Sequence, residues 1–590
     1  MILQALTAYY EALVKKGGIA RPGWGNAKIS YALELDENGG LIRTTPLSSP
    51  SADGKKPLPR QMDLPAAVKR TMGISPNFLW DNSSYLLGFD AKGKPDRARE
   101  CFAAARKLHL ALLGDLDDPF ARAVCRFFER WNLDTAAANP VFADCLEEIQ
   151  KGANLVFRFG GEFAGDDDVL RRVWQAHYDG GTKNADGETM RCLVTGGKVV
   201  PEKIHPPIKN VAGAQPSGAA LVSFNAEAFC SYGREQNLNA PVGKYAAFAY
   251  AAALNALLAD RDHVWRCGDT TVVFWAEDAE PAYQDVFTSF ANGGGDRITD
   301  SELKSCVSAL LRGEIPAWKG AELHPDNPFF ILGLAPNAAR ISVRFFLRGT
   351  FGRFLENVQR HYDNIRIVGD NRSKGDIPLW ALLRETVNLN SKNKGASPQM
   401  AGDTVRAVLT GQRYPATLYQ QTQLRIRAER NVTRGRAEII KGYLIRMNHN
   451  EDYKEALTVE LNENTRYQPY VLGRLFSVLE GLQQAANPGI NTTIKDRYFT
   501  SAGATPGIVF PTLLNLAEKH LRKLDGGLRV HYARQITELT GYLTEDYPAH
   551  HNLYDQGIFQ LGYYHQTQKR FEKKDKQKSA ETIKEEKENG

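Results

Sequence analysis

The chain has few cysteines and no long run of apolar residues. Its seven cysteines form no Cys-x-x-Cys pair, which argues against a structural zinc site and against a disulfide framework. This usage is typical of a reducing compartment, so we expect a cytoplasmic protein. No stretch approaches the roughly 18 uncharged apolar residues that a membrane helix needs. The sequence therefore predicts neither a secreted nor a membrane-spanning protein, and residues 1–16 predict an amphipathic helix rather than a signal peptide.

Catalytic motifs are also missing. Residues 88–94 have the spacing of a phosphate-binding loop, but Pro95 stands where the magnesium-binding hydroxyl residue should be. Asp166, Asp167 and Asp168 offer carboxylates to a divalent metal, yet they precede a predicted helix, where a solvated cap is the commoner role. We therefore expect no enzyme activity, no cofactor and no metal site. The alternative is a metal-dependent nuclease that uses this acidic cluster.

Positive charge is concentrated in one part of the chain. The net charge is +6, and residues 340–446 contain 20 Lys and Arg against 8 Asp and Glu, a local net of +12. Sixteen of these cations are arginine, whose planar guanidinium binds two phosphate oxygens at once. A solvated face of ion pairs would contain a similar number of acidic residues. The imbalance favours a phosphate-rich partner, such as a nucleic acid, over that interpretation.

The pattern of apolar residues predicts an α+β fold with several domains, because 590 residues exceed the roughly 250–300 that one core accommodates. The first part mixes helices with predicted β-hairpins at 29–42, 192–200 and 329–346 and a buried strand at 269–277. Later apolar residues recur at helical spacing. We predict an α+β domain at 1–350, a basic, mostly helical connecting region at 351–460, an all-α C-terminal helical bundle at 461–572 and a charged disordered tail at 573–590.

Two polar segments, 73–88 and 213–243, resist a packing explanation. Glycines let a backbone approach a ligand, and amide side chains donate and accept at base edges. The alternative is a pair of ordinary loops whose side chains bond to their own backbone. The candidates for reading a DNA motif, to which Lys209 is added, are Asn77, Asn82, Ser83, Ser84, Gln215, Ser217, Asn225, Arg234, Gln236, Asn237 and Asn239.

The candidates for contacts with a nucleic-acid backbone are cations of the second half of the chain. In the basic stretch they are Arg344, Arg348, Arg353, Arg372, Lys374, Arg425, Arg427, Arg430, Arg434 and Arg436. In the predicted bundle they are Arg474, Lys495, Arg497, Lys519, Arg522, Lys523, Arg529 and Arg534. For most of the second group the alternative is a solvated helix face.

Four strings of the sequence resemble one known family. The opening MILQALTAYYEALV, the segments NFLWDNSSYLLG (77–88) and GAQPSGAALVSFNAEAFCSYGREQ (213–236), and the late GYYHQ (562–566) resemble the large subunit of the type I-C CRISPR Cascade. The match is collinear from the first residue to about residue 570. The long strings make the resemblance specific, but they do not identify which side chains contact DNA.

The resemblance implies membership of an RNA-guided antiviral surveillance complex in the bacterial cytoplasm. Such a large subunit sits at the 5′-handle end of the CRISPR guide RNA, beside the handle-binding subunit and the backbone subunits. It reads the protospacer-adjacent motif of double-stranded target DNA, helps to unwind it, and stabilises the R-loop and the displaced strand. It also recruits a helicase-nuclease. Copies of the small subunit are made separately from the family's own C-terminal region.

This function fits the composition of the chain. Base pairing with the guide supplies most of the sequence specificity, so the protein needs polar loops and an arginine-rich surface and no catalytic triad. We therefore expect a non-catalytic DNA-recognition and assembly subunit. A purely structural RNA-binding scaffold is a further alternative, beside the metal-dependent nuclease.

Overall fold

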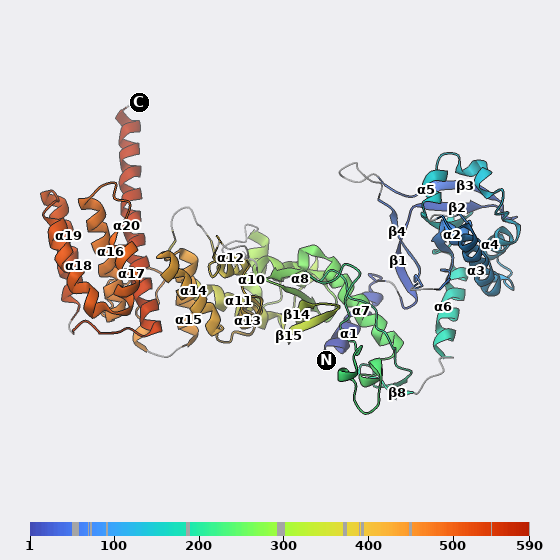
Figure 1. Cartoon of the computed structure of the whole chain (residues 1–590), viewed down its shortest axis with the longest axis horizontal. Helices are drawn as coiled ribbons and strands as arrows, with labels where there is room; N and C mark the ends of the chain where they lie inside the picture. The colour runs from blue at the N-terminus through green and yellow to red at the C-terminus, as the bar shows by residue number, and fades with distance from the viewer. Residues whose placement is uncertain are drawn as a thin grey trace. The chain divides into compact units, whose positions relative to one another are not determined.

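The chain folds into two compact units. The computed structural model describes residues 1–19, 21–49, 58–68, 70, 73–89, 93–183, 189–291, 301–369, 375–388, 390, 395–447, 451–543 and 546–588. The first unit consists of Met1–Pro206 with Val222–Ala253, and the second of Pro207–Leu221 with Leu254–Gly590 (Figure 1). The predicted boundaries at residues 350 and 460 both lie inside the second unit.

A five-stranded sheet forms the centre of the first unit. Its strand order is β3 (Leu41–Pro46), β2 (Tyr31–Leu35), β6 (Asn154–Phe159) and β5 (Trp80–Asn82), and β7 (Glu162–Phe163) pairs with β6. Strands β2 and β3 form the hairpin predicted from residues 29–42, with Leu35 opposite Leu41. Strand β2 runs parallel to β6, and β5 runs antiparallel to it. Helices α2 (Ser83–Leu86), α3 (Pro95–Leu113), α4 (Pro119–Arg130) and α5 (Leu146–Gln150) complete this part.

The rest of the first unit joins distant parts of the chain. Strands β1 (Trp24–Ile29) and β4 (Arg60–Pro65) pair antiparallel. Helix α6 (Asp168–Lys183) precedes a short hairpin of β8 (Met190–Arg191) and β9 (Lys198–Val199). A hairpin was predicted at 192–200; its second strand lies in that range, but its first strand comes before residue 192. Helix α1 (Ile2–Lys15) packs against α7 (Lys244–Ala259), where the rings of Tyr10 and Phe248 meet edge to face at 5.8 Å.

The second unit begins with an antiparallel sheet of four strands. Their order is β10 (Trp265–Cys267), β11 (Thr270–Ala276), β14 (Pro328–Asn337) and β15 (Arg340–Thr350). Every residue of β11 is buried, as predicted for 269–277, and β14–β15 is the predicted third hairpin. Helices α8 (Pro281–Ala291), α10 (Ser301–Leu311) and α11 (Phe351–Ile365) and the small β12 (Ala317–Trp318)–β13 (Ala321–Glu322) hairpin pack around this sheet.

The remainder of the second unit is helical, so the predicted α+β class with an all-α C-terminal part is confirmed. The connecting part contains α12 (Leu379–Arg384), α13 (Pro398–Thr410), α14 (Ala416–Glu429) and α15 (Arg434–Met447). The C-terminal bundle contains α16 (Gln468–Ala486), α17 (Ile494–Ala504), α18 (Pro506–Leu521), α19 (Gly526–Gly541) and α20 (Leu553–Glu588).

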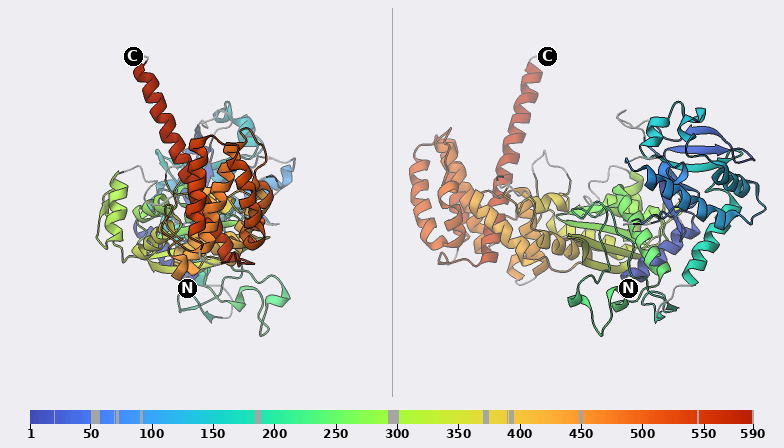
Figure 2. Two further views of the ribbon diagram at one scale, coloured as in Figure 1. Left: turned by 90° about the vertical axis from the view of Figure 1, so that its left-hand side faces the viewer. Right: turned by 45° about the vertical axis from the view of Figure 1, so that its right-hand side comes forward.

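Helix α20 has two features that the sequence pattern did not predict. It shares one continuous core with the connecting helices: Gln423 of α14 and Gln560 of α20 exchange buried hydrogen bonds of 2.9 and 2.8 Å. Moreover, α20 extends past the bundle to Glu588, whereas we predicted a disordered tail from residue 573 (Figure 2). No glycine or proline interrupts 573–588, and its Lys, Glu and Gln residues favour helix.

Candidate nucleic-acid interface

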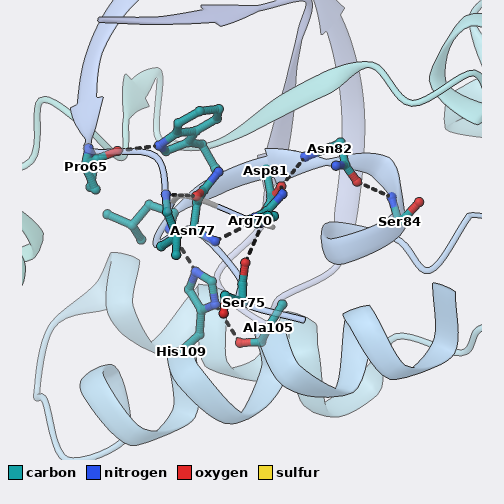
Figure 3. Close-up of polar contacts among 12 residues, drawn as sticks. Pro65, Arg70, Ser75, Asn77, Asp81, Asn82, Ser84, Ala105 and His109 are labelled. Carbon is teal, nitrogen blue, oxygen red and sulfur yellow. Dashed lines mark hydrogen bonds and ion pairs between the residues drawn. The ribbon is translucent and has the colours of Figure 1, made fainter. Parts of the chain in front are cut away.

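The first predicted segment, 73–88, surrounds a buried ion pair. Asp81 of β5 is 1 % exposed, and the two outer nitrogens of the Arg70 guanidinium bond to its two carboxylate oxygens, with 3.0 Å from Nη1 to Oδ1 (Figure 3). The backbone N–H groups of Asn77 and Asn82 donate to the same carboxylate at 2.8 and 2.7 Å. Burial raises the pKa of Asp81, and the Arg70 hydrogen bond opposes that shift. The carboxylate therefore fixes the conformation of the segment from inside.

The candidate side chains of this segment make contacts within the protein. Asn77 is buried, and its Oδ1 accepts from Val68 N at 2.8 Å. Ser83 is also buried, so neither side chain is on the surface. Asn82 is half-buried and caps α2 by accepting from Ser84 N at 3.0 Å, while Ser84 Oγ donates to Phe89 O at 2.8 Å. The packing interpretation accounts for Asn77 and Ser83, because a base cannot reach either without rearrangement.

A buried histidine supports the same segment from α3. His109 Nε2 accepts from Leu79 N at 2.8 Å, and its Nδ1 lies 2.8 Å from Ala105 O, so the neutral ring carries its proton on Nδ1. Leu79 has a φ of +68°, a conformation unusual for a leucine, and the hydrogen bond that its amide donates to His109 stabilises this conformation. Figure 3 shows His109 and its contact with Ala105. Burial lowers the pKa of His109 to about 4.

The segment should therefore lose stability in acid. The unfolded chain binds a proton at His109 near pH 6.5, whereas the native chain binds it only near pH 4, so proton uptake between these values favours unfolding. Glutamine does not titrate, so the His109→Gln variant is the reference. We expect the difference in free energy of unfolding between wild type and this variant to fall by about 2 kcal/mol from pH 7.5 to pH 5. Hydrogen exchange of peptides covering 73–89, corrected for intrinsic rates at each pH, measures this difference. A difference independent of pH would contradict the account.

The second predicted segment is divided between the two units. Lys209, Gln215 and Ser217 belong to the second unit and are exposed. The backbone N–H of Lys209 donates to Asn255 Oδ1 at 2.8 Å, and Lys209 is exposed. Residues 222–243 belong to the first unit. Residues that flank β8 and β9 bond to the end of this segment: Leu193 N donates to Pro241 O at 2.9 Å, and Glu202 N donates to Val242 O at 2.8 Å. The described structure thus assigns the predicted candidates to two separate units.

Within the first unit, residues 225–239 form an exposed loop that we call the tip loop. Asn239 organises it: Oδ1 accepts from Ser231 N at 2.8 Å, and Nδ2 donates to the carbonyl oxygens of Arg234 and Gln236, both at 2.9 Å. Asn237 is buried, and Asn225, Arg234 and Gln236 are exposed. Asn239 therefore bonds to the loop's own backbone, as the alternative interpretation proposed, whereas Asn237 is buried and its Oδ1 has no hydrogen-bond partner among the described residues.

The tip loop presents an aromatic ring to solvent. Tyr232 is 99 % exposed, with a φ of +55°, and Gln236 has a φ of +48°. A non-glycine residue in this left-handed region costs about 1–3 kcal/mol, and such residues concentrate at ligand sites. The loop thus exposes Tyr232, Arg234 and Gln236 to solvent, and Tyr232 and Gln236 have a strained backbone conformation. Tyr232 was not among the predicted residues, because an aromatic ring in a sequence gives no sign of its exposure.

The arginines of the basic stretch fall into two groups. Several serve the protein interior: Arg436 is 4 % exposed and contacts Glu385 and Glu429, and Arg434 Nε donates to Glu438 Oε1 at 2.8 Å. Burial raises the pKa of Glu438 to about 8. Arg436 is therefore a packing residue, paired with the partly exposed carboxylates of Glu385 and Glu429, and the half-buried Arg434 pairs with the buried carboxylate of Glu438.

Other predicted cations of this stretch remain at the surface. Arg344 is half-buried and bonds to Asp269 at 2.9 Å, and Arg425 lies 3.6 Å from Glu429. Arg372 and Lys374 lie outside the described residues. The exposed members are Arg348, Arg353, Arg427 and Arg430. Among these, Arg427 donates to Gln556 at 2.8 Å.

The cations of the C-terminal bundle divide in the same way. Arg474 is 4 % exposed and donates to Gln566 at 3.1 Å, so it is a packing residue of the bundle. Lys495 is half-buried, and burial lowers its pKa. The exposed members are Arg497, Lys519, Arg522, Lys523, Arg529 and Arg534. Three further arginines that the sequence did not single out, Arg360, Arg413 and Arg446, line a groove described below.

The acidic cluster that could support a nuclease acts as a helix cap. Asp167 Oδ1 accepts from the backbone N–H groups of Val169 and Leu170 at 2.9 and 2.8 Å, at the start of α6. Within the described residues, His, Cys, Asp and Glu side chains nowhere gather in a group of three that would hold a metal ion. The described parts of the chain also contain no helix with the length and apolarity needed to cross a membrane.

Comparison with known proteins finds one family. The model of a family described as CRISPR-associated protein (Cas_Csd1) matches residues 6–571, nearly the whole chain. The match covers both units and includes the tip loop and the groove lined by Arg360, Arg413 and Arg446. None of the curated proteins compared with the chain matches it.

Proposed function

The chain belongs to this family of CRISPR-associated proteins, and we propose that it is the non-catalytic large subunit of a type I-C Cascade. In this role it binds the protospacer-adjacent motif, helps to unwind target DNA, stabilises the R-loop and the displaced strand, and recruits a helicase-nuclease. Its partners are the guide RNA with its 5′ handle, the backbone and handle-binding subunits, and small-subunit copies from its own C-terminal region. Its location is the cytoplasm.

One observation supports this function most: the tip loop. Its bare Tyr232 can stack on a base or wedge between bases, and Arg234 and Gln236 beside it can bond to base edges. Asn239 holds the loop before any ligand arrives, which reduces the ordering that binding requires. The exposed cations of the second unit supply backbone affinity, which needs no base recognition.

The motif-reading role predicts a selective loss of binding. Gln236→Ala in the assembled guide-bound complex should weaken binding to a duplex with the cognate motif by about 1–3 kcal/mol, and binding to a scrambled motif far less. Gln236 is a cleaner probe than Asn82, whose side chain also caps α2. Competition binding with two duplexes that differ only in the motif measures the effect.

The matched control is Gln421→Ala, which removes an exposed glutamine from α14. It should leave both affinities unchanged. Equal losses on the two duplexes in Gln236→Ala would exclude Gln236 from sequence reading. Loss of guide assembly with unchanged motif selectivity would instead indicate the structural scaffold.

The C-terminal bundle has the surface expected of a strand-binding module. Its exposed cations lie mainly on α18, α19 and the turn between them, and α19 buries only Leu539 of its 16 residues. A second polypeptide started at Met447, the only methionine after Met400, would contain α16–α20. It would lack Gln423 and leave the buried amide of Gln560 without its partner. We therefore expect the separate copies to cover that face of α20 by packing against another protein chain.

A further inference from the structure

A surface groove in the second unit brings together three arginines with no acidic residue on its wall. It lies between α11, the turn after α13 and the end of α15, and its volume is about 670 Å³. Its lining residues are Arg360, Asn364, Gly411, Gln412, Arg413, Ile445 and Arg446. The sequence placed all three arginines in the basic stretch but gave no reason to group them, because 86 residues separate Arg360 from Arg446.

Arg446 provides a fixed charge at the floor of the groove. Its Nη1 donates to Ala407 O at 2.8 Å and to Gln412 O at 2.7 Å, and its guanidinium lies 4.1 Å from the centroid of the Tyr414 ring. Its Nε and Nη2 atoms are buried and have no hydrogen-bond partner among the residues that the structure describes. Burial lowers the pKa of Arg446, and the nearby charge of Arg360 adds to this effect. Carbonyl oxygens and a ring cannot neutralise a buried guanidinium, so its positive field remains uncompensated.

Arg360 and Arg413 are exposed at the rim of the groove. Among the described residues, no carboxylate forms an ion pair with either of them or with Arg446. The turn after α13 lies close against α11, because a Cβ added to Gly411 would be 3.4 Å from Arg360 Nη1. Asp363 of α11 accepts from Gln359 at 2.8 Å. Glu356 and Asp326 line a neighbouring cavity that Arg360 and Arg353 also line, so Arg360 lies between the groove and that acidic cavity.

We propose that this groove binds a phosphate of a nucleic-acid strand, with Arg360 and Arg413 as direct donors and Arg446 as a fixed charge behind them. Two exposed planar guanidinium groups can each give two hydrogen bonds to phosphate oxygens. The amides of Asn364 and Gln412 on the same wall can donate to a further oxygen or to a sugar. This inference rests on the proposed function, which requires a nucleic-acid partner and does not itself locate a phosphate site.

The test is equilibrium binding of a fluorescent 30-residue oligo-dT strand to the full-length chain at several salt concentrations. The variant is Arg360→Gln with Arg413→Gln; Arg446 is kept, because its contacts with Ala407, Gln412 and Tyr414 join α13 to α15. The matched control is Arg99→Gln with Arg312→Gln, which removes two exposed arginines that pair with Asp134 and Glu314. Both double variants change the net charge by the same amount.

We expect the groove variant to bind the strand about 5- to 20-fold more weakly near 100 mM salt. The slope of log binding constant against log salt concentration should become less steep by roughly 0.7 to 1.4, the value for one or two phosphates. The control should stay within about twofold of wild type. Equal affinities and equal salt slopes in the two double variants would overturn the phosphate site but not the proposed function. Failure of the wild type to bind the strand would overturn the proposed nucleic-acid function as well. If inorganic phosphate displaced the strand at a concentration equal to that of the strand's phosphate groups, the groove would be a site for free phosphate, and the assignment to a strand would be overturned.

Discussion

Replacing Gly473 with alanine is expected to destabilise the C-terminal bundle by about 3 kcal/mol or more. Gly473 of α16 faces the backbone of α20, where an added Cβ would lie 2.8 Å from Tyr563 N and closer still to Phe559 O. Gly562 of α20 makes the reciprocal contact, since its Cβ would lie 2.9 Å from the carbonyl carbon of Tyr470. A rotamer change cannot relieve a clash with main-chain atoms, so the two helices must separate. Hydrogen exchange of peptides from both helices in the full-length chain measures the loss.

Gly541→Ala is the matched control for this prediction. Gly541 ends α19, and apart from its own helix and chain neighbours no atom of the described residues lies within 4 Å of the Cβ that alanine would add. Alanine has a higher helix propensity than glycine by up to about 1 kcal/mol, so this change should be neutral or slightly stabilising. If the two variants had similar stability, the close crossing of α16 and α20 would be refuted.

Asp81→Ala should destabilise the segment 73–88 by about 3–5 kcal/mol. The change leaves the Arg70 guanidinium without its carboxylate and removes the acceptor of the Asn77 and Asn82 amides. Burial raises the pKa of Asp81, and the hydrogen bonds from Arg70 and from the two amides oppose that shift. The effect should appear as faster hydrogen exchange and faster proteolysis around β5 and α2.

Asp117→Ala is the control for the ion pair. Asp117 also binds an arginine, Arg122, but its side chain is 93 % exposed. Exposed ion pairs contribute about 0–1 kcal/mol, so this variant should resemble wild type. An Asp81→Ala chain as stable as Asp117→Ala would show that the buried pair does not hold the segment.

The sequence predicted local structure better than the grouping of elements. The turn at 36–40 and the buried strand at 269–277 follow from the nearest neighbours in the chain, and both are present. The boundary at residue 460 depended on helical spacing alone. Spacing cannot show that Gln423 and Gln560 exchange hydrogen bonds or that the glycines of α16 and α20 face each other's backbone. Those contacts join residues about a hundred positions apart.

For the candidate site, residue type was a poor guide to exposure. Asn77, Asn237 and Arg436 have the chemistry of DNA-binding residues, but each is buried. Asp81 belongs to the polar segment 73–88, but its buried carboxylate bonds to Arg70 and stabilises the packing of that segment. The exposed members, such as Arg234 and Gln236, were predicted, whereas Tyr232 and the groove of Arg360 and Arg413 required the three-dimensional arrangement.

The most direct test of the central claim is photocrosslinking from the tip loop. A benzophenone side chain placed at position 232 replaces a tyrosine that is 99 % exposed, so the change does not disturb the core. In the assembled complex with a guide and a matching duplex, the proposed function predicts crosslinks to bases of the protospacer-adjacent motif, and few crosslinks when that motif is scrambled. Crosslinks to protein subunits alone, or equal crosslinking to both duplexes, would contradict motif recognition by this loop.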